Sequence, residues 1–321
     1  MLETFLILFS VFESIKSAEI LLLHTNDLRG NLEGTYSNLH ARKIGGYSRL
    51  SYIISKARNQ PRSAVLYLDS GDVYSDPLWS DGLTRKILIE LANHLNPDAA
   101  SLGCHNYLNP EIMREFLGRI KFPVVVSNLK FRPNKEIKIL PNLILNIGGI
   151  RLGLVGYVTP KMHVLSETGE ADDGIQIEDE IIGVSREVQN LIASNVSLII
   201  ALGHSGHQTD RIIAEEIAGI DVILGGFSHG LYWNDRESPG DERIRGGYPI
   251  VVKNRRTHKD VLIFHTYGFA KYLGQIRLKF DEESKLISYD ANPIFLGHDL
   301  PENPEMTHKI RRGIQTNQLR R

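Results

Sequence analysis

Short hydrophobic runs alternate along most of the chain with segments whose hydrophobic residues recur at helical spacing. Runs such as Ile20–His24, Val65–Leu68 and Leu198–Leu202 are rich in Leu, Ile and Val and are typical of buried strands. Between such runs, the segments 47–57 and 84–95 place hydrophobic residues three and four positions apart, which predicts helices. The alternation of strands and helices predicts a layered α/β fold.

The pattern changes after residue 248. Three longer runs, at 250–253, 261–266 and 273–280, predict strands that pair antiparallel and close the sheet system. Beyond them, residues 299–321 contain prolines and a basic stretch, which indicates a linker-like tail or a frayed helix. Residues 19–298 are therefore expected to form one folded domain.

The first 18 residues resemble a secretory signal peptide. A short hydrophobic core at Leu6–Phe12 precedes the small residues Ser17 and Ala18, where cleavage is expected. Glu3 and Glu13 do not suit a signal peptide, so a disordered or amphipathic leader stays open as an alternative. We expect a secreted, extracellular protein, and no later stretch of the sequence is long and hydrophobic enough to span a bilayer.

Composition narrows the classes of partner. The chain has 321 residues, of which 42% are hydrophobic and 23% charged, which is ordinary for a globular protein. The formal net charge of -1 does not favour nucleic acid or an anionic membrane as a partner. The single cysteine, Cys104, excludes an intrachain disulfide, so the fold depends on its core.

Polar residues gather where five of the predicted strands end. In open α/β sheets, ligands bind at the carboxyl ends of strands, and glycines there let the backbone come close to a ligand. The five clusters are His24-Thr25-Asn26-Asp27, Asp69-Ser70-Gly71-Asp72, Gly103-Cys104-His105-Asn106, Gly203-His204-Ser205-Gly206 and Gly225-Gly226-Phe227-Ser228-His229.

Five such clusters in sequence are hard to explain as helix caps alone. A single Asp after a strand is often a helix N-cap, and a single His is more often structural than a ligand. Carboxylates and imidazoles from several strand ends, converging on one crevice, instead indicate a metal centre. Two metal ions that share a bridging carboxylate are one form such a centre can take.

The clusters, in this order, resemble the motifs of the metallophosphoesterase domain in the 5'-nucleotidase and apyrase family. That family carries HTND-x-H-G, L-D-x-G-D, G-N-H-E-F-D, H-S-G and G-G-H-S-H, and the match runs from about residue 20 to residue 281. The resemblance implies a four-layer αββα sandwich of the metallo-dependent phosphatase type. It also implies hydrolysis of nucleotide phosphate esters with divalent metal ions.

The resemblance implies roles for five residues. Asp27 and His229 match ligands of a first metal ion, and His204 matches a ligand of a second. Asp72 matches the carboxylate that bridges the two ions. His105 matches the catalytic histidine that stabilises the transferring phosphoryl group.

Four other family positions are substituted. Arg29 and Phe227 replace histidine ligands, Cys104 replaces an asparagine ligand, and Leu108 replaces the aspartate that pairs with the catalytic histidine. A guanidinium stays protonated and offers no lone pair, and a phenyl ring has no donor atom, so neither binds a metal ion. Leu108 cannot orient the imidazole of His105.

The remaining donors leave two interpretations of metal binding open. Arg29 would repel a divalent ion and neutralise Asp27 or Asp72, which predicts that no two-metal centre forms. Alternatively, Asp72, His204 and Cys104 hold one divalent ion such as zinc, because a thiolate ligand favours zinc. Without a metal ion, Cys104 is a small buried residue.

We therefore expect a secreted 5'-nucleotidase-like protein whose catalysis is lost or greatly weakened, because two-metal hydrolysis needs both ions. Such a protein would bind a nucleotide or another phosphate-bearing small molecule, with Arg29 as the phosphate anchor. The alternative is a residual hydrolase of AMP, ADP or ATP that uses one metal ion at Asp72, His204 and Cys104. The chain ends about where the resemblance places the linker to a C-terminal nucleotide-binding domain, so we expect that base-binding surface to be missing.

Overall fold

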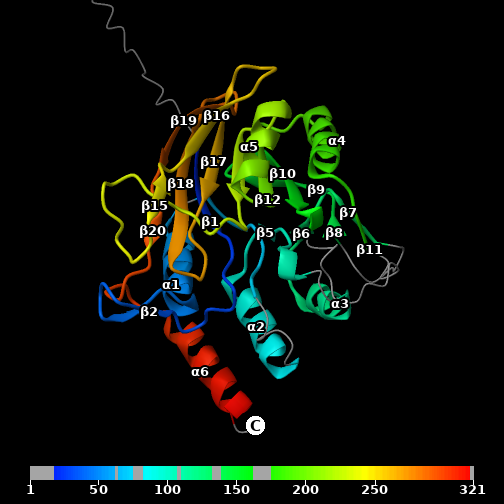
Figure 1. Ribbon diagram of the computed structural model, residues 1–321. Coiled ribbons are helices and arrows are strands. Elements are labelled where there is room, and N and C mark those ends of the chain that lie inside the picture. The colour runs from blue at the N-terminus through cyan, green and yellow to red at the C-terminus, as the bar shows by residue number, and fades with distance from the viewer. Residues whose placement is uncertain are drawn as a thin grey trace, which may run out of the picture.

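Two β-sheets lie against each other in the middle of the molecule, and helices cover the outer side of each sheet (Figure 1). This computed structural model describes residues 18–61, 64–74, 82–106, 110–131, 139–161 and 175–318. The predicted four-layer αββα arrangement is confirmed. The signal-like residues 1–17 and the substituted position Leu108 lie outside the described residues.

The larger sheet contains eight strands among the described residues. β1 (Ala18–Thr25) lies inside it, parallel to β4 (Ala64–Asp69) and antiparallel to β18 (Tyr272–Phe280). The order across the sheet is β19 (Leu286–Ala291), β18, β1, β4, β5 (Ala99–Ala100), β6 (Val124–Val125) and β8 (Ile139–Leu140), with β20 (Ile294–Phe295) paired to β18.

The second sheet contains six strands in the described part of the chain. Its order is β16 (Ile250–Lys253), β17 (Asp260–His265), β13 (Val222–Gly225), β12 (Leu198–His204), β10 (Ile150–Val158) and β9 (Asn142–Ile147). The expectation of antiparallel pairing for the last three predicted strands is only partly met. β17 is antiparallel to β16 but parallel to β13, and β18 belongs to the other sheet. A strand pattern in the sequence does not specify which neighbour the strand pairs with.

The main hydrophobic core lies between the two sheets. Leu22 and Leu66 face it from the larger sheet, and Leu154 and Ile200 face it from the second. All four side chains are fully buried, and each comes from a strand whose partners continue the same core. This core fixes the two sheets relative to each other and therefore fixes where their strands end.

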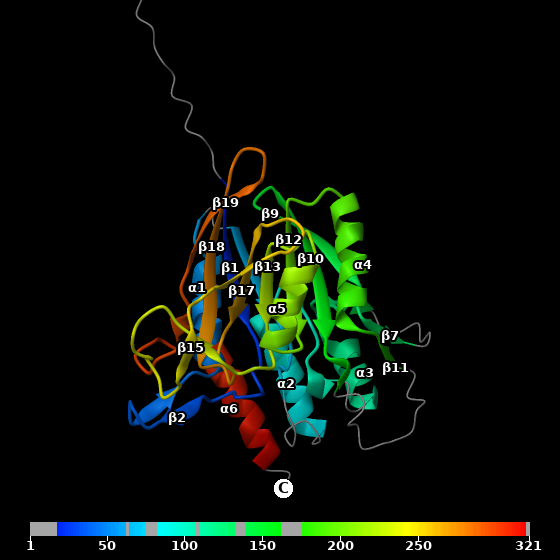
Figure 2. The same ribbon diagram turned by 45° about the horizontal axis from the view of Figure 1, so that its top comes forward.

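Helices form the outer layers. The larger sheet carries α1 (Tyr47–Arg58), α2 (Gly82–Leu95), α3 (Pro110–Arg119) and α6 (Pro304–Gln318), and the second sheet carries α4 (Glu180–Ala193) and α5 (His207–Glu216). Figure 2 shows α4 and α5 on the side of β10 and β12, while α6 extends away from the sheets.

Short elements complete the fold. One turn of 3-10 helix spans Cys104–Asn106, directly after β5. In the part of the chain that the structure describes, three two-stranded ribbons pair β2 (Thr35–Ser37) with β3 (Arg42–Ile44), β7 (Leu129–Phe131) with β11 (Ile175–Ile177), and β14 (Leu231–Tyr232) with β15 (Ile244–Gly246).

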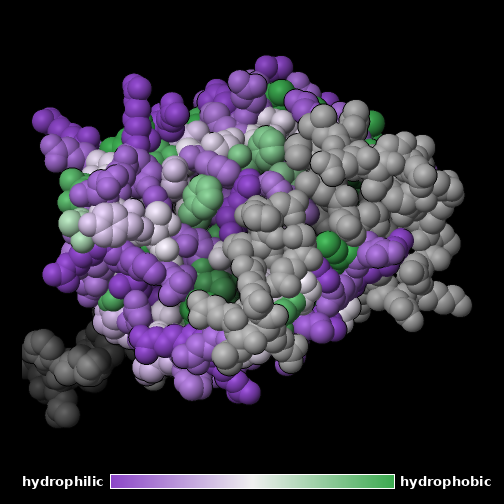
Figure 3. Space-filling view, turned by 60° about the horizontal axis from the view of Figure 1, so that its bottom comes forward, coloured by the Kyte–Doolittle hydropathy of each residue, from purple (hydrophilic) through white to green (hydrophobic). Residues whose placement is uncertain are grey.

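One face of the molecule is mainly hydrophilic where the described residues form it (Figure 3). Figure 3 turns the lower side of the molecule toward the viewer and shows hydrophilic side chains with isolated hydrophobic ones between them. No helix within the described residues combines the length and the hydrophobicity that crossing a membrane requires.

The segment predicted as a linker-like tail or a frayed helix is a packed helix over most of its length. In α6, Met306 is fully buried and Ile310 is 4% exposed, and both join a cluster with Leu50 of α1 and Leu91 of α2. The hydrophobic residues of this segment recur at helical spacing, which the prolines and basic residues around them obscured. α6 is therefore part of the domain's hydrophobic structure.

Replacing Met306 with alanine should test this packing. We expect Met306→Ala to lower the free energy of unfolding by about 2–5 kcal/mol, because it removes a fully buried side chain. Urea denaturation followed by circular dichroism measures the change. The control is Glu305→Ala in the same helix, whose side chain is 67% exposed and should change stability by less than about 0.5 kcal/mol. Equal effects of both substitutions would contradict the packed arrangement.

Candidate functional site

The predicted strand-end residues come together at one end of the two sheets. β1 and β4 are parallel neighbours in one sheet, and β12 and β13 are parallel neighbours in the other. Asp27 and Asp72 follow the first pair of strands, and His204 and His229 end or follow the second pair. Because parallel strands finish at the same edge, four distant parts of the sequence meet in one crevice.

Asp27 organises one side of this crevice. Its Oδ2 accepts hydrogen bonds from the side-chain amide of Asn26 and the backbone N–H of Phe227, both at 2.8 Å. Its Oδ1 lies 2.9 Å from Nε2 of His229. Burial opposes the charged form of Asp27, but the nearby His204 and the hydrogen bond from His229 lower the pKa of Asp27 below its ordinary value.

Asp72 organises the other side. Its Oδ2 lies 2.7 Å from Nδ1 of His105, and its Oδ1 accepts the backbone N–H of His105 at 3.1 Å. Gly103 makes this position possible, because a Cβ there would collide with the Asp72 carboxylate. Burial opposes ionisation of Asp72, but His204 and the hydrogen bond from His105 hold its pKa below the ordinary value.

Arg29 points between these two carboxylates. Its Nη2 lies 3.6 Å from Oδ1 of Asp27, 3.4 Å from Oδ2 of Asp72 and 3.1 Å from Nε2 of His229. Arg29 was expected to pair with Asp27 or Asp72, and in the structure it contacts both. Its guanidinium lies among three residues that the resemblance assigns to the first metal ion, and it supplies the positive charge there.

His204 is oriented by a backbone carbonyl. Its Nδ1 donates to the carbonyl oxygen of Ser70 at 2.7 Å, so its Nε2 faces the crevice. This Nε2 is buried, lies 3.2 Å from Oδ2 of Asp72 and makes no hydrogen bond among the described residues. Burial opposes the charged form, but Asp72 and Asp27 raise the pKa of His204 well above its ordinary value.

His105 sits between Asp72 and Arg29. The hydrogen bond to Asp72 raises the pKa of His105 to about 10, and the adjacent Cys104 adds to the shift. Its Nε2 lies 3.3 Å from Nη1 of Arg29. The predicted catalytic histidine is thus held on the carboxylate by which the family bridges its two metal ions.

The donor atoms fit one metal ion better than two. Among the described residues, ligand atoms of Asp72, Cys104 and His204 all lie within 4.8 Å of one another. Metal-binding histidines have one nitrogen fixed by an outer hydrogen bond, and His204 has Nδ1 on a backbone carbonyl and Nε2 directed at Asp72. The first position does not fit a second ion, because Arg29 lies among its donors.

Backbone strain concentrates at the same place. Residues that carry a Cβ rarely adopt positive φ, and such outliers cluster at functional sites. Five of the site residues do so, namely Asp27 (51°), Arg29 (53°), Asp72 (55°), Phe227 (73°) and His229 (46°).

One histidine of the motifs, His24, does not belong to the site. His24 is buried in β1, and its Nε2 lies 2.6 Å from the hydroxyl of Tyr248. Burial lowers the pKa of His24 to about 3, so it is a neutral core residue. Sequence reasoning missed two orienting contacts, the Ser70 carbonyl on His204 and the Asn26 amide on Asp27. Both residues lie inside the quoted motifs, but nothing in the sequence specifies the direction of their polar groups.

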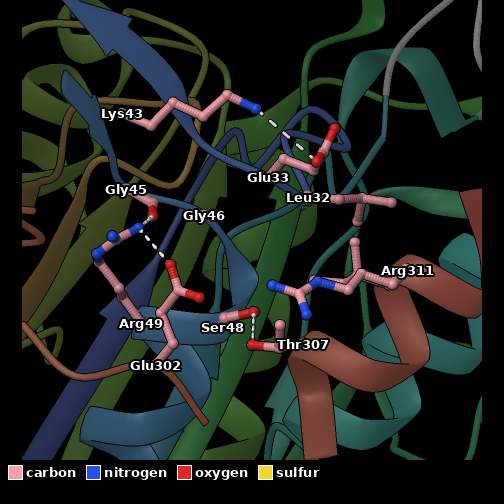
Figure 4. A pocket seen from close by; sticks show the side chains of 11 residues that line it. Leu32, Glu33, Lys43, Gly45, Gly46, Ser48, Arg49, Glu302, Thr307 and Arg311 are labelled. Carbon is pink, nitrogen blue, oxygen red and sulfur yellow. Dashed lines mark hydrogen bonds and ion pairs between the residues drawn. The ribbon is translucent and has the colours of Figure 1, made fainter. Parts of the chain in front are cut away.

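A separate polar pocket of about 170 Å³ lies between the start of α1 and α6 (Figure 4). Arg49 crosses it to Glu302 at 3.0 Å, and the hydroxyls of Ser48 and Thr307 lie 2.9 Å apart. The predicted site residues do not line this pocket. Its side-chain contacts join α6 to α1.

The two-sheet sandwich, with carboxylates and imidazoles at its strand ends, defines a protein of the metallo-dependent phosphatase class. A 5'-nucleotidase precursor from Thermus thermophilus superposes with a TM-score of 0.84 at 26% identity, covering 94% of this chain and 59% of that one. A calcineurin-like phosphoesterase from Bacillus subtilis shares the fold with a TM-score of 0.71 at 20% identity, covering 94% of this chain and 98% of that one.

Sequence comparison gives the family. The chain is 34% identical to human 5'-nucleotidase over 303 residues, which are 91% of this chain and 52% of the human protein. A snake venom 5'-nucleotidase from Naja atra is 32% identical over 308 residues, or 92% of this chain and 57% of the venom protein. No protein-family model matches the chain. The chain belongs to the 5'-nucleotidase family and spans about half the length of the curated relatives it matches.

The absorption spectrum of bound cobalt(II) should show whether Cys104 is one of the metal ligands. We expect the wild-type protein to give a thiolate-to-cobalt absorption band, because Cys104 lies beside Asp72 and His204. Cys104→Ser should lose the band and bind cobalt about tenfold more weakly. The control variant Arg29→Gln should keep the band, because Arg29 is not in this donor group. A cobalt complex of the wild-type protein without the band would contradict a thiolate ligand.

Proposed function

We propose that this protein is a secreted member of the 5'-nucleotidase family that binds a nucleotide or another phosphate-bearing small molecule, with hydrolysis lost or greatly weakened. The observation that carries the proposal is the position of Arg29 between Asp27 and Asp72. A guanidinium held there supplies a fixed positive charge and planar N–H donors, which suit a phosphate group.

The basic side chains of the crevice lie nearer to solvent than its carboxylates. The side chains of Arg29, His105 and His229 are 15%, 20% and 29% exposed, while Asp27 and Asp72 are fully buried. A phosphate approaching from solvent would meet the donors before the carboxylates. The Nε of Arg29 is buried and has no hydrogen-bond partner within the described residues, which leaves one N–H without a partner.

Weakened hydrolysis follows from the donors that the substitutions remove. Two metal ions in such a site activate the attacking water and carry the charge that develops in the transition state. Arg29 stabilises charge but cannot deprotonate a water nucleophile, because guanidinium has no lone pair. His105 remains in place and would stabilise a bound phosphoryl group.

A second candidate function is a hydrolase that uses one metal ion. It is favoured by the grouping of Asp72, Cys104 and His204 and by the direction of the His204 Nε2, which faces Asp72. These three residues would hold the ion, which would polarise a phosphoryl oxygen or lower the pKa of a bound water. Arg29 and His105 would then orient the phosphate. AMP, ADP and ATP are the substrates that the family implies.

Secretion is proposed from the signal-like first 18 residues. It is supported by the sequon Asn195-Val196-Ser197, whose asparagine is exposed after α4 and therefore accessible to glycosylation. The named relatives include venom 5'-nucleotidases.

Removing the charge of Arg29 should weaken phosphate binding. We expect Arg29→Gln to lower the affinity for inorganic phosphate about tenfold to hundredfold, because a charge-assisted hydrogen-bond donor is lost. Isothermal titration calorimetry measures the affinity. Arg211→Gln serves as the matched control, because Arg211 lies on α5 with its side chain 45% exposed and paired with Glu215. Unchanged phosphate affinity in Arg29→Gln would contradict the anchor.

Restoring the family's donors should restore catalysis. We expect the triple variant Arg29→His, Cys104→Asn and Phe227→His to bind two metal ions per chain and to hydrolyse AMP about a hundredfold faster than wild type, because individual ligand losses commonly cost about tenfold to a thousandfold. Metal analysis of the purified proteins and phosphate release from AMP provide the measurements. Two tightly bound metal ions and fast AMP hydrolysis in the wild-type protein would contradict the proposal that hydrolysis is lost or greatly weakened.

A further inference from the structure

Phe227 is an exposed aromatic residue at the edge of the candidate site. It follows β13, its surface is 38% exposed, and its φ of 73° lies in the left-handed region. A bulky side chain is uncommon in that region. A phenyl ring that stays partly in solvent also contributes little hydrophobic free energy to folding. The fold therefore holds an apolar ring in a strained, exposed position beside the charged crevice.

The ring is rigidly supported. Its backbone N–H donates to Oδ2 of Asp27 at 2.8 Å, and the next residue, Ser228, accepts the N–H of His207 at 2.7 Å. The ring lies over Gly206, where a Cβ would come within 3.2 Å of its Cδ1. It also packs edge-on against His204, with centroids 6.0 Å apart and planes at 77°. These contacts fix one side of the ring and leave part of its surface to solvent.

We propose that Phe227 is the stacking surface for the base of a nucleoside monophosphate whose phosphate is bound by Arg29. This inference rests on the proposed function and names the part of the ligand that would give it specificity. The Asp27 carboxylate contacts both the backbone of Phe227, at 2.8 Å, and the guanidinium of Arg29, at 3.6 Å. The ring itself packs against His204, and His204 and Arg29 both contact Asp72, so the ring and the cation lie beside the same carboxylate and a single nucleotide could touch both.

The chemistry of the two neighbours selects the class of ligand. Arg29 and His105 suit a phosphate, and a supported phenyl ring suits a flat heterocycle. Stacking of a base on an aromatic side chain is favourable for every base, because each has a flat π-face. The ring would therefore distinguish nucleotides from simple sugar phosphates, with little discrimination among the bases. It would place base recognition within this domain, at a position where the family carries a metal ligand.

Calorimetric titration with three probes tests this assignment. AMP carries phosphate, ribose and base, ribose 5-phosphate lacks the base, and inorganic phosphate lacks both. We expect wild-type protein to bind AMP about tenfold more tightly than ribose 5-phosphate. Phe227→Ala should bring AMP affinity down to that of ribose 5-phosphate and leave ribose 5-phosphate unchanged. Phe227→Trp should retain the preference for AMP.

Tyr289→Ala is the matched control. Tyr289 is 40% exposed, similar to Phe227. Through Leu278 it lies level with Ile20, near the start of β1, whereas Asp27 follows the other end of that strand. This substitution should change the affinity for none of the three probes. A second measurement is the proton NMR shift of the adenine ring, which wild type should move upfield by ring current and Phe227→Ala should not.

The outcomes separate the two proposals. If ribose 5-phosphate binds, loses affinity in Arg29→Gln, and binds as tightly as AMP, the phosphate anchor stands and the stacking surface is overturned. If Phe227→Ala weakens AMP and ribose 5-phosphate by the same factor, the stacking surface is also overturned. If none of the three probes binds wild type, the proposed function fails and the stacking assignment fails with it.

Discussion

The ion pair between Arg29 and the buried carboxylates of Asp27 and Asp72 governs the chemistry available to this fold. Both carboxylates are fully buried, and two negative charges cannot remain close together in that setting without a positive partner. Removing one partner of a buried ion pair commonly costs about 3–5 kcal/mol. Arg29 shares this neutralising role with His204, His105 and His229, which lower the pKa values of the two carboxyl groups, and it would compete with a metal ion for them.

The fold creates this constraint by bringing strand ends together. Parallel strands in two packed sheets finish at one edge, and the core between the sheets holds that edge in place. Asp27, Arg29 and Asp72 all have positive φ, which costs about 1–3 kcal/mol for each residue. Packing elsewhere offsets that cost. The result is a rigid crevice in which a substitution changes the chemistry without disturbing the sheets.

The ordered motifs predicted the fold class correctly and named residues that lie together at one edge of the sheets, because hydrophobic periodicity and strand-end residues are local properties of the sequence. The pairing of β17 was only partly predicted, since the pattern of a strand does not contain the identity of its neighbours. The packing of α6 was not predicted, because prolines and charges concealed the spacing of Met306 and Ile310. Their burial depends on α1 and α2, which are distant in sequence.

The sequence by itself determined which donors exist, because a guanidinium, a thiol and a phenyl ring have fixed chemistry wherever they lie. It therefore decided that the first metal position lacks a histidine and that Cys104 can offer sulfur. Only the tertiary structure decided in which direction the polar and aromatic groups point. Arg29 points inward between two carboxylates, the Ser70 carbonyl accepts from His204, and part of the Phe227 side chain faces solvent. Those directions arise from contacts between segments far apart in the chain, and local sequence carries no record of them.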